Sequence, residues 1–449
     1  MDPRALDLPQ FVACLKKRNP GQAEFVQAVE EVVRDLANAA GDMTELARWE
    51  ILRRIAEPDR VISFRVVWQD DHGGIRVQRG WRVQHSNAIG PYKGGIRFHR
   101  SVSESVLKFL AFEQTLKCSL TGLPLGGAKG GANFNPKAKS DGEVMRFCQS
   151  FMTELYRHVG DDIDVGAGDI GVGEREIGYM FGQYKRITNR FNGVLTGKSR
   201  NHGGSAVRTE ATGWGVILFL QQMLAVSGAD IAGKTAAISG AGNVAIHAAR
   251  KFVSLGGKVL TVSDSEGFIH DRDGLDVQKL DWIEANKNNG GRVSAFAREF
   301  SSATFHEAKA PWSVPCDVAI PCATQNEIAE EDAKSLIANG CSAVCEGANM
   351  PTQPRAIRLF KAANIPFAPG KAANAGGVAV SGFEMSQNAA RIPWPEDAVY
   401  QQLVQIMSGI HDRCREFGEE RGGRVDYAKG ANVASFQNVA KAMLAHGAL

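Results

Sequence analysis

Three lysines in the stretch from Pro91 to Gly131 stand where a lysine is structurally awkward. Lys93 precedes two glycines, Lys117 lies in an apolar segment, and Lys129 lies inside the run Gly-Gly-Ala-Lys-Gly-Gly. Glycine lets a backbone approach a ligand closely, and a lysine is rarely buried without a partner. We therefore expect these ammonium groups to face a cleft and to bind a small dianion, with one lysine left over for chemistry.

The elements that would carry these lysines are strands and helices of an N-terminal domain. Apolar residues at helical spacing predict helices within residues 21–56, and alternating β-branched segments predict strands at 61–68 and 75–83. A further helix is expected over 103–120, where Gln114 and Lys117 are three residues apart and share a face. One helix face can therefore present an amide and an ammonium group together.

A dinucleotide-binding pattern follows a loop at residues 197–205, where we place a domain boundary. A short apolar strand is expected at 234–239, and Gly240 opens a G-x-G-x-x-A turn into a helix. The next strand ends at Asp264, 24 residues after Gly240. Gly240 permits the tight turn, Gly242 lets the backbone reach a pyrophosphate, and the helix N-terminus offers free N–H groups. A tight turn with no ligand is the alternative, but the strand-turn-helix-strand context favours dinucleotide binding.

Three later apolar strands, at 317–321, 342–345 and 365–368, alternate with helices. This order predicts an α/β protein with a Rossmann-type, doubly wound parallel sheet. Polar residues follow each of these strands, at the sheet edge where such sheets bind ligands. From the turn, from these strand ends and from the family resemblance given below, the expected cofactor-binding residues are Thr212, Gly240, Gly242, Asn243, Val244, Ser263, Asp264, Ser265, Ala323, Thr324, Asn349 and Asn374.

Composition argues against several other classes of protein. The 449 residues suffice for two or three domains, and 44% hydrophobic residues provide for their cores. A net charge of +3, spread along the chain, predicts no nucleic-acid or membrane partner. The eight cysteines form no C-x-x-C pair, so we expect neither a metal site nor disulfides. No signal peptide or long apolar run is present, which predicts a soluble, cytoplasmic protein.

Four motifs carry a resemblance to a known family. They are Pro-Tyr-Lys-Gly-Gly-Ile-Arg at 91–97, Gly-Gly-Ala-Lys-Gly-Gly at 126–131, Gly-Ala-Gly-Asp-Ile-Gly at 166–171 and Glu-Gly-Ala-Asn at 346–349. In this order they resemble the motifs of the hexameric, bacterial-type glutamate dehydrogenases of the Glu/Leu/Phe/Val dehydrogenase family. The resemblance covers nearly the whole chain. It implies reversible oxidative deamination of L-glutamate to 2-oxoglutarate and ammonium, by hydride exchange with NADP(H) and through an iminium.

The same resemblance implies a domain organisation and a homohexamer. Residues 1–202, completed by a C-terminal helix at about 427–449, would form an α/β domain for substrate binding and oligomerisation. Residues 203–426 would form the Rossmann dinucleotide-binding domain, and the cleft between the two would close on the substrate.

Site residues follow from the resemblance as well. It implies that Lys117 with Gln114 binds the α-carboxylate, and that Lys93 with Ser381 binds the side-chain carboxylate. Lys129 would be the general acid or base, its charge disfavoured by burial, and Asp169 would move protons to and from the amino nitrogen. The alternatives are a solvated Lys93 in a turn and Asp169 as a helix N-cap. One departure is Gly166, where the family usually has proline, which could loosen the loop that carries Asp169.

The generic rule for dinucleotide-binding folds and the family resemblance predict different cofactors. An acid at the end of the second strand, here Asp264, favours NAD by binding the ribose 2′-hydroxyl. Residues 263–267, Ser-Asp-Ser-Glu-Gly, instead resemble the segment of NADP-using glutamate dehydrogenases, whose serines meet the 2′-phosphate. Lys287 and Arg292 are candidates to assist, with surface solvation as the alternative. We predict NADP, with NAD as the alternative.

Two other functions fit parts of the sequence. Lys129 could form a Schiff base in a pyridoxal or aldol-type enzyme, because a desolvated lysine is a good nucleophile. The dinucleotide turn argues against that reading. A catalytically silent, nucleotide-binding sensor is the second, because a fold does not fix a function. The full set of three lysines and Asp169 argues against a silent protein.

Overall fold

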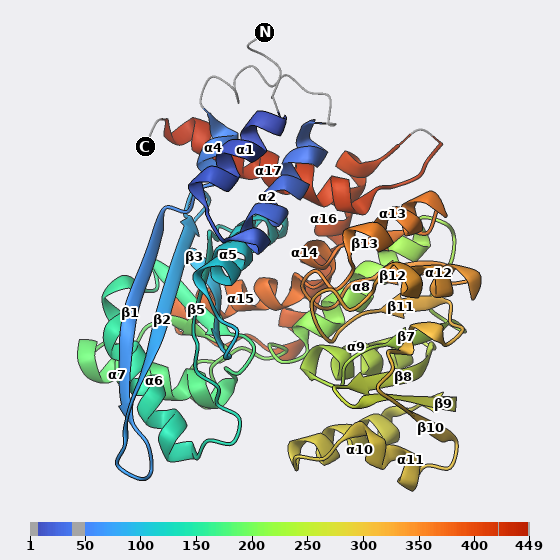
Figure 1. Ribbon diagram of the computed structural model, residues 1–449, viewed down its shortest axis with the longest axis horizontal. Helices are drawn as coiled ribbons and strands as arrows, with labels where there is room; N and C mark the ends of the chain where they lie inside the picture. The colour runs from blue at the N-terminus through green and yellow to red at the C-terminus, as the bar shows by residue number, and fades with distance from the viewer. Residues whose placement is uncertain (1–7, 38–49, 421, 448–449) are drawn as a thin grey trace. The chain divides into compact units, whose positions relative to one another are not determined.

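The computed structural model describes residues 8–37, 50–420 and 422–447 (Figure 1). The chain divides into two compact units, of which unit 1 comprises Met1–Ala206, Ala379–Val399 and Asn432–Leu449. Unit 2 comprises Val207–Val378 and Tyr400–Ala431. The domain bounds expected from the sequence, at 202/203 and about 427, stay predictions.

A six-stranded sheet organises unit 1, in the order β1-β2-β4-β3-β5-β6. The pairs β1/β2 and β2/β4 are antiparallel, whereas β3 runs parallel to both β4 and β5, and β5 to β6. The strands predicted at 61–68 and 75–83 are confirmed. The strands are β1 (Arg60–Gln69), β2 (Ile75–Ser86), β3 (Tyr92–Phe98), β4 (Gly127–Ala132), β5 (Asp164–Gly168) and β6 (Leu195–Thr196).

Helices cover both faces of this sheet. Helix α5 (Glu104–Thr121) begins where the Ser103 hydroxyl accepts the N–H of Val106, and it ends at the left-handed Gly122. It packs on Trp81 and Val83 of β2, while helices α6 and α7 pack on an aromatic core around Phe98 of β3. The other helices of unit 1 are α1 (Leu8–Arg18), α2 (Ala23–Ala37), α4 (Ile51–Ile55), α6 (Asp141–Leu155), α7 (Glu174–Thr188), most of α15 (Gly376–Ala390) and α17 (Tyr427–His446), and the 3-10 turns η1 (Tyr156–His158) and η2 (Arg200–His202).

Unit 2 is built on a seven-stranded sheet in the order β10-β9-β8-β7-β11-β12-β13. Strands β8, β7, β11, β12 and β13 are parallel, which confirms the doubly wound α/β prediction. An antiparallel edge that the sequence analysis did not include follows β8. The strands are β7 (Thr235–Ile238), β8 (Lys258–Asp264), β9 (Gly267–Leu275), β10 (Ala303–Glu307), β11 (Val318–Ile320), β12 (Ala343–Cys345) and β13 (Phe367–Ala368).

The helices of unit 2 bury their apolar residues against this sheet. Phe360 of α13 and Leu336 of α12 share one core cluster with Val344 of β12. The helices are α8 (Ala211–Ala225), α9 (Asn243–Ser254), α10 (Val277–Asn288), α11 (Phe296–Glu299), α12 (Glu330–Ala338), α13 (Pro354–Ala362), α14 (Gly370–Ala373) and α16 (Glu396–Gly418), with 3-10 turns η3 (Val293–Ala295) and η4 (Pro311–Ser313). Within the described ranges, no helix is long and apolar enough to cross a membrane.

Candidate active site

The three lysines singled out in the sequence all lie in unit 1, and all are buried. Lys93 is on β3, Lys117 on α5 and Lys129 on β4, with 2%, 7% and 5% of their surfaces exposed. A lysine in a solvated turn would be largely exposed, whereas Lys93 is buried, so the alternative of a solvated Lys93 is wrong. Burial of three ammonium groups in one unit is costly unless anionic partners accompany them.

A carboxylate accompanies Lys129. Asp169 follows β5, and its Oδ2 lies 3.1 Å from Lys129 Nζ and 2.7 Å from Arg97 Nε. Helix α7 begins at a different N-cap, Gly173, so the alternative of Asp169 as that helix's N-cap is wrong. The carboxylate is therefore held by two cations.

Strand register explains why this pair forms beside a glycine. Strand β3 runs between β4 and β5, so Gly95 lies next to the strand segments that carry Lys129 and lead to Asp169. A Cβ on Gly95 would stand 2.9 Å from Asp169 Cβ and 3.2 Å from Lys129 Nζ. The glycine of the Lys-Gly-Gly motif therefore leaves the space in which the two catalytic candidates meet.

Burial shifts the proton affinities of this cluster. Burial lowers the pKa of Lys129, and the negative charge of Asp169 partly offsets this shift. Burial also lowers the pKa of Lys117 to about 8, and the positive charge of Lys129 lowers it further. Burial alone would raise the pKa of Asp169, but Lys129 and Arg97 outweigh it and hold that pKa well below its usual range. Asp169 is therefore ionised at neutral pH.

Gln114 and Cys118 complete this buried cluster on α5. The Gln114 amide donates from Nε2 to Cys118 Sγ at 3.3 Å. Burial raises the pKa of the Cys118 thiol, and the charges of Lys93 and Lys117 act against that rise. The structure therefore brings Lys93, Gln114 and Lys117 together. Ser381 is buried on α15 and belongs to the same unit.

The glycine-rich turn of unit 2 has the shape that a pyrophosphate needs. Gly240 has a φ of 81° and donates its N–H to Ser263 Oγ at 2.7 Å. Gly242 is the N-cap of α9, and the nearest atom to a Cβ built there is Lys287 Nζ at 3.9 Å. The helix N-terminus is thus open to an approaching anion. Ala245 is fully buried where the helix packs on the sheet.

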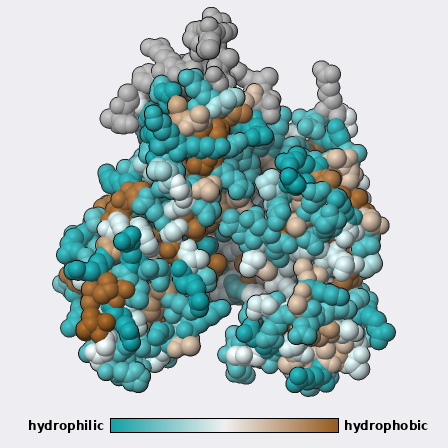
Figure 2. Space-filling model, in the orientation of Figure 1, coloured by the Kyte–Doolittle hydropathy of each residue, from teal (hydrophilic) through white to brown (hydrophobic). Residues whose placement is uncertain are grey.

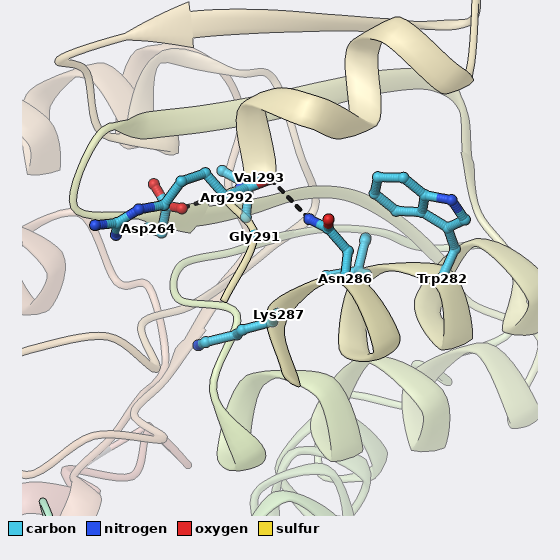
Figure 3. Close-up of a pocket in the computed structure, with 8 residues that line it drawn as sticks. Asp264, Trp282, Asn286, Lys287, Gly291, Arg292 and Val293 are labelled. Carbon is cyan, nitrogen blue, oxygen red and sulfur yellow. Dashed lines mark hydrogen bonds between the residues drawn. The ribbon is translucent and has the colours of Figure 1, made fainter. Parts of the chain in front are cut away.

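Asp264 stands at the end of β8, at a small pocket that Lys287 and Arg292 also line (Figure 3). Its carboxylate accepts the N–H groups of Glu266 at 2.8 Å and of Val293 at 3.0 Å. Arg292 donates to Ser265 Oγ at 3.2 Å, and Lys287 donates to a carbonyl of the glycine-rich turn, that of Ala241, at 2.7 Å. Two cations and an exposed serine hydroxyl therefore surround the predicted ribose position.

Polar groups also gather after the strands on the other side of β7. The N–H groups of Ala323 and Thr324 both donate to Glu327. The Asn374 amide donates to Gly347 O at 2.9 Å and to Asn349 Oδ1 at 3.2 Å. Its buried Oδ1 has no hydrogen-bond partner in the part of the chain that the structure describes. A buried acceptor of this kind fits a ligand that brings its own donor.

The rest of the predicted cofactor set lies at the start of two helices of unit 2. Thr212 is in the first turn of α8, and Asn243 and Val244 open α9. Asn243 donates to the carbonyl of Thr209 at 2.6 Å, so the two helix starts are joined. No group of three or more potential metal ligands lies together among the residues described.

Comparison with known proteins identifies the family. Residues 203–447 match the Glutamate/Leucine/Phenylalanine/Valine dehydrogenase model, and residues 58–186 match the Glu/Leu/Phe/Val dehydrogenase, dimerisation domain. The chain belongs to the Glu/Leu/Phe/Val dehydrogenase family.

Individual members of the family resemble the chain over nearly its whole length. An NAD(P)-specific glutamate dehydrogenase of Xylanibacter ruminicola is 54% identical, over 98% of this chain and 99% of that one. The NADP-specific glutamate dehydrogenase of Escherichia coli (strain K12) is 52% identical, over 98% and 99%. A crystal structure of Plasmodium falciparum glutamate dehydrogenase is 44% identical, with a TM-score of 0.95, and covers 100% of this chain and 98% of that one.

Two arginines of this dehydrogenase were not assigned a role from the sequence. Arg97 bonds to Asp169, and it closes the motif that contains Lys93, four residues away on the same face of β3. That even spacing along a strand was the available signal. Arg82 is fully buried, pairs with Asp164 and donates to Gly94 O at 3.1 Å. Its position inside a predicted strand gave no such signal.

Gly166 lies inside strand β5, where the sequence analysis expected a loop next to Asp169. Its N–H donates to Val194 O at 3.1 Å, a bond that a proline could not make. A Cβ there would stand 2.6 Å from the end of the Leu195 side chain. In this member of the family the residue is therefore a paired strand residue.

Proposed function

We propose that this dehydrogenase catalyses the reversible oxidative deamination of L-glutamate to 2-oxoglutarate and ammonium. The buried cluster of Lys93, Lys117, Lys129 and Asp169 carries the proposal. Glutamate has two carboxylates, and the two further buried lysines of this unit, Lys93 and Lys117, provide one ammonium group for each of them. An apolar amino acid would leave one ammonium group without its counter-charge, which is how the site would reject it.

In this proposal the two carboxylates are divided between two pairs of residues. Lys117 with Gln114 binds the α-carboxylate, and Lys93 with Ser381 binds the side-chain carboxylate. Support for the first pair is their common buried face on α5. Support for the second is that Lys93 and Ser381 are both buried, at 2% exposure each, in the same unit.

Proton transfer is assigned to Lys129 and Asp169. A lysine whose pKa is lowered by burial gives up its proton more readily than a solvated lysine does, and its ammonium form can stabilise the alkoxide of a carbinolamine. Asp169, held ionised by Lys129 and Arg97, would stabilise the positive iminium and pass protons to and from the amino nitrogen. A bound nicotinamide dinucleotide supplies or accepts the hydride.

The residues of unit 2 fit such a dinucleotide. The open N-terminus of α9 suits the pyrophosphate, Asp264 lies where the ribose of the adenosine half is expected, and Asn374 Oδ1 is a free acceptor within the described structure.

Two alternative functions predict different results. Borohydride trapping of a substrate on Lys129 would favour the Schiff-base alternative instead. A silent sensor would bind the dinucleotide without turnover.

NADP is the proposed cofactor, with NAD as the alternative. Lys287 and Arg292 line the same pocket as Asp264, and Arg292 already contacts the exposed Ser265. Ser263 is turned inward to the glycine-rich turn. The 2′-phosphate would therefore be met by Ser265 and the two cations rather than by Ser263. The Asp264 carboxylate, occupied by two backbone N–H groups, would be a weaker partner for a free 2′-hydroxyl.

A homohexamer and a cytoplasmic location complete the proposal, both carried over from the sequence. Support for an oligomer comes from the edge of the unit 1 sheet. Hydrophobic residues gather over β1 and β2 (Figure 2), where Val67, Ile75 and Val77 are 40%, 66% and 59% exposed. Exposed apolar patches of this kind mark protein contacts.

The test is the initial rate of 2-oxoglutarate reduction with ammonium, followed by loss of nicotinamide absorbance, with NADPH and NADH in parallel. Turnover that strongly prefers NADPH is expected. A preference for NADH would restore the generic rule for Asp264. No turnover with either cofactor, under conditions in which the dinucleotide binds, would favour the sensor.

A further inference from the structure

Glu346 is a buried carboxylate at the end of β12 to which the sequence assigned no role. Only 4% of its surface is exposed. One carboxylate oxygen, Oε1, accepts the N–H of Thr352 at 3.2 Å, and the other, Oε2, accepts the N–H of Gly370 at 2.7 Å. Thr352 belongs to the loop after β12 and Gly370 to the start of the segment after β13. One side chain therefore joins two loops of adjacent strands.

A second side chain joins the same loops from the opposite direction. Asn374, just after α14, donates to the carbonyls of Gly347 and Ala348 at 2.9 and 3.2 Å, and to Asn349 Oδ1. Close packing enforces the arrangement, because a Cβ on Gly370 would stand 2.4 Å from Ala348 O. Together, Glu346 and Asn374 form a clamp between residues 346–352 and 370–374.

The clamp fixes the direction of one oxygen, Asn374 Oδ1, that has no hydrogen-bond partner among the residues described. With its amide nitrogen committed to three acceptors, Asn374 must turn Oδ1 away from them. That oxygen is buried, and no residue that the structure describes donates to it. A carboxamide whose orientation is fixed in this way is a ready acceptor for an N–H₂ group of a ligand.

Sheet order indicates which part of a dinucleotide would meet the clamp. The glycine-rich turn follows β7 and Asp264 ends β8, on one side of the point where strand order reverses. Strands β11, β12 and β13 lie on the other side of β7. A dinucleotide spans the reversal point, one half on each side. The clamp at β12 and β13 therefore belongs to the nicotinamide half, whose carboxamide carries an N–H₂ group.

We propose that Glu346 is a positioning residue for the nicotinamide half of the cofactor, which acts by holding the two loops so that Asn374 Oδ1 faces the carboxamide. The proposal rests on the proposed use of a nicotinamide dinucleotide. Glu346 touches neither cofactor nor substrate in this role. Its replacement should weaken contacts of the nicotinamide half and leave those of the adenosine half intact.

The test compares binding of two ligands to the full-length protein by isothermal titration calorimetry. One ligand is NADPH, and the other is 2′-phospho-ADP-ribose, which lacks the nicotinamide. In Glu346→Gln, one of the two N–H groups loses its acceptor, because the amide nitrogen cannot accept. We expect the Kd for NADPH to rise about fivefold or more, and the Kd for the fragment to change less than about twofold.

Asp317→Asn is the matched control. Asp317 also joins adjacent strands through backbone hydrogen bonds, since its Oδ2 accepts the N–H of Thr235 at 2.7 Å, but it precedes β11 at the opposite end of the strand. This variant should bind both ligands as the wild type does. Equal weakening of both ligands in Glu346→Gln, or no weakening, would overturn the proposal. A wild-type protein that binds neither NADPH nor NADH would overturn the proposed cofactor itself.

A second measurement does not depend on the stability of the variant. Amide hydrogen exchange of the ligand-free wild type should be slow at Thr352 and Gly370, as slow as in strand β12, because the clamp is already closed in the protein alone. Exchange as fast as in exposed loops would show that the carboxylate does not hold these N–H groups and would rule the clamp out.

Discussion

Lys117 should give the reaction a pH dependence on the alkaline side. Its burial lowers the pKa to about 8, so the free enzyme loses this positive charge as the pH rises through that value. Because the charged form binds the α-carboxylate, kcat/KM for 2-oxoglutarate should fall by about tenfold for each pH unit above about 8. The measurement is a pH profile of kcat/KM at saturating ammonia and cofactor.

The matched variant is Lys117→Arg, whose guanidinium stays protonated throughout that range. Its kcat/KM should be lower at neutral pH, because the geometry of the anion site changes, yet the decline near pH 8 should disappear. An unchanged alkaline limb in this variant would mean that another group titrates there.

Lys129 is the residue on which turnover should depend most. Replacement by alanine removes the proton donor and acceptor beside Asp169, and we expect kcat to fall by roughly 10³-fold with the Kd for NADPH unchanged. Lys108→Ala is the control. Lys108 is also a buried lysine of unit 1, but its ammonium group donates to Asn19 Oδ1, whereas that of Lys129 pairs with Asp169. It should lose stability and keep its kcat. Near-normal turnover in Lys129→Ala would end the catalytic assignment.

At the scale of elements, the strand β3 holds its neighbours at a spacing that admits no side chain at Gly95. The Cβ of Gly95→Ala would stand 2.9 Å from Asp169 Cβ and 3.0 Å from the backbone oxygen of Gly168, so Asp169 must move. Misplacement of a catalytic group by an ångström costs roughly 10²-fold in rate. Steady-state kinetics should show this loss in kcat.

Gly178→Ala in helix α7 provides the comparison for that variant. A Cβ there meets nothing within 4 Å, so the substitution should raise the free energy of unfolding by about 1 kcal/mol through helix propensity. Its kcat should match the wild type. Equal kcat values for Gly95→Ala and Gly178→Ala would contradict a tightly held site on β3.

Local patterns were enough to predict the elements that carry the site. The helix α5, with Gln114 and Lys117 on one face, follows from apolar residues at helical spacing. The turn at Gly240 follows from the glycine positions, because the turn needs a left-handed backbone at Gly240 and glycine adopts that conformation without strain. Both depend on interactions between residues that are close in the sequence, so the order of the residues is enough to predict them.

Long-range packing decided the features that the sequence did not predict. Strands β9 and β10 add an antiparallel edge because the hairpin after Asp264 folds back on β8. Ser263 turns inward because Gly240 has a free N–H that needs an acceptor. Arg82 is fully buried because Asp164, 82 residues later, supplies its counter-charge. Ser263 and Asp164 lie 23 and 82 residues from their partners, so no local pattern predicts these two pairings.

On the scale of the whole molecule, the exposed apolar face of the β1–β2 hairpin is the feature that indicates contact with another subunit. Val67 and Val77 are directly opposite each other across the two strands, and both are largely exposed. Strand β1 is also the edge of its sheet, so within the described ranges one of its sides has no neighbouring strand. An apolar face beside an open edge favours association over a solvated monomer.

A charge placed in this patch should therefore reduce the size of the particle. Val77→Lys puts an ammonium group where an interface would bury it, at a cost of several kcal/mol for each contact of this kind. Light scattering after size-exclusion chromatography should give a wild-type mass that is a multiple of 48.4 kDa and a smaller multiple for Val77→Lys. Val277→Lys, at a position 50% exposed at the start of α10, should keep the wild-type mass. A monomeric wild type, or three proteins of one mass, would mean that this face of β1 and β2 is exposed to solvent in the working enzyme.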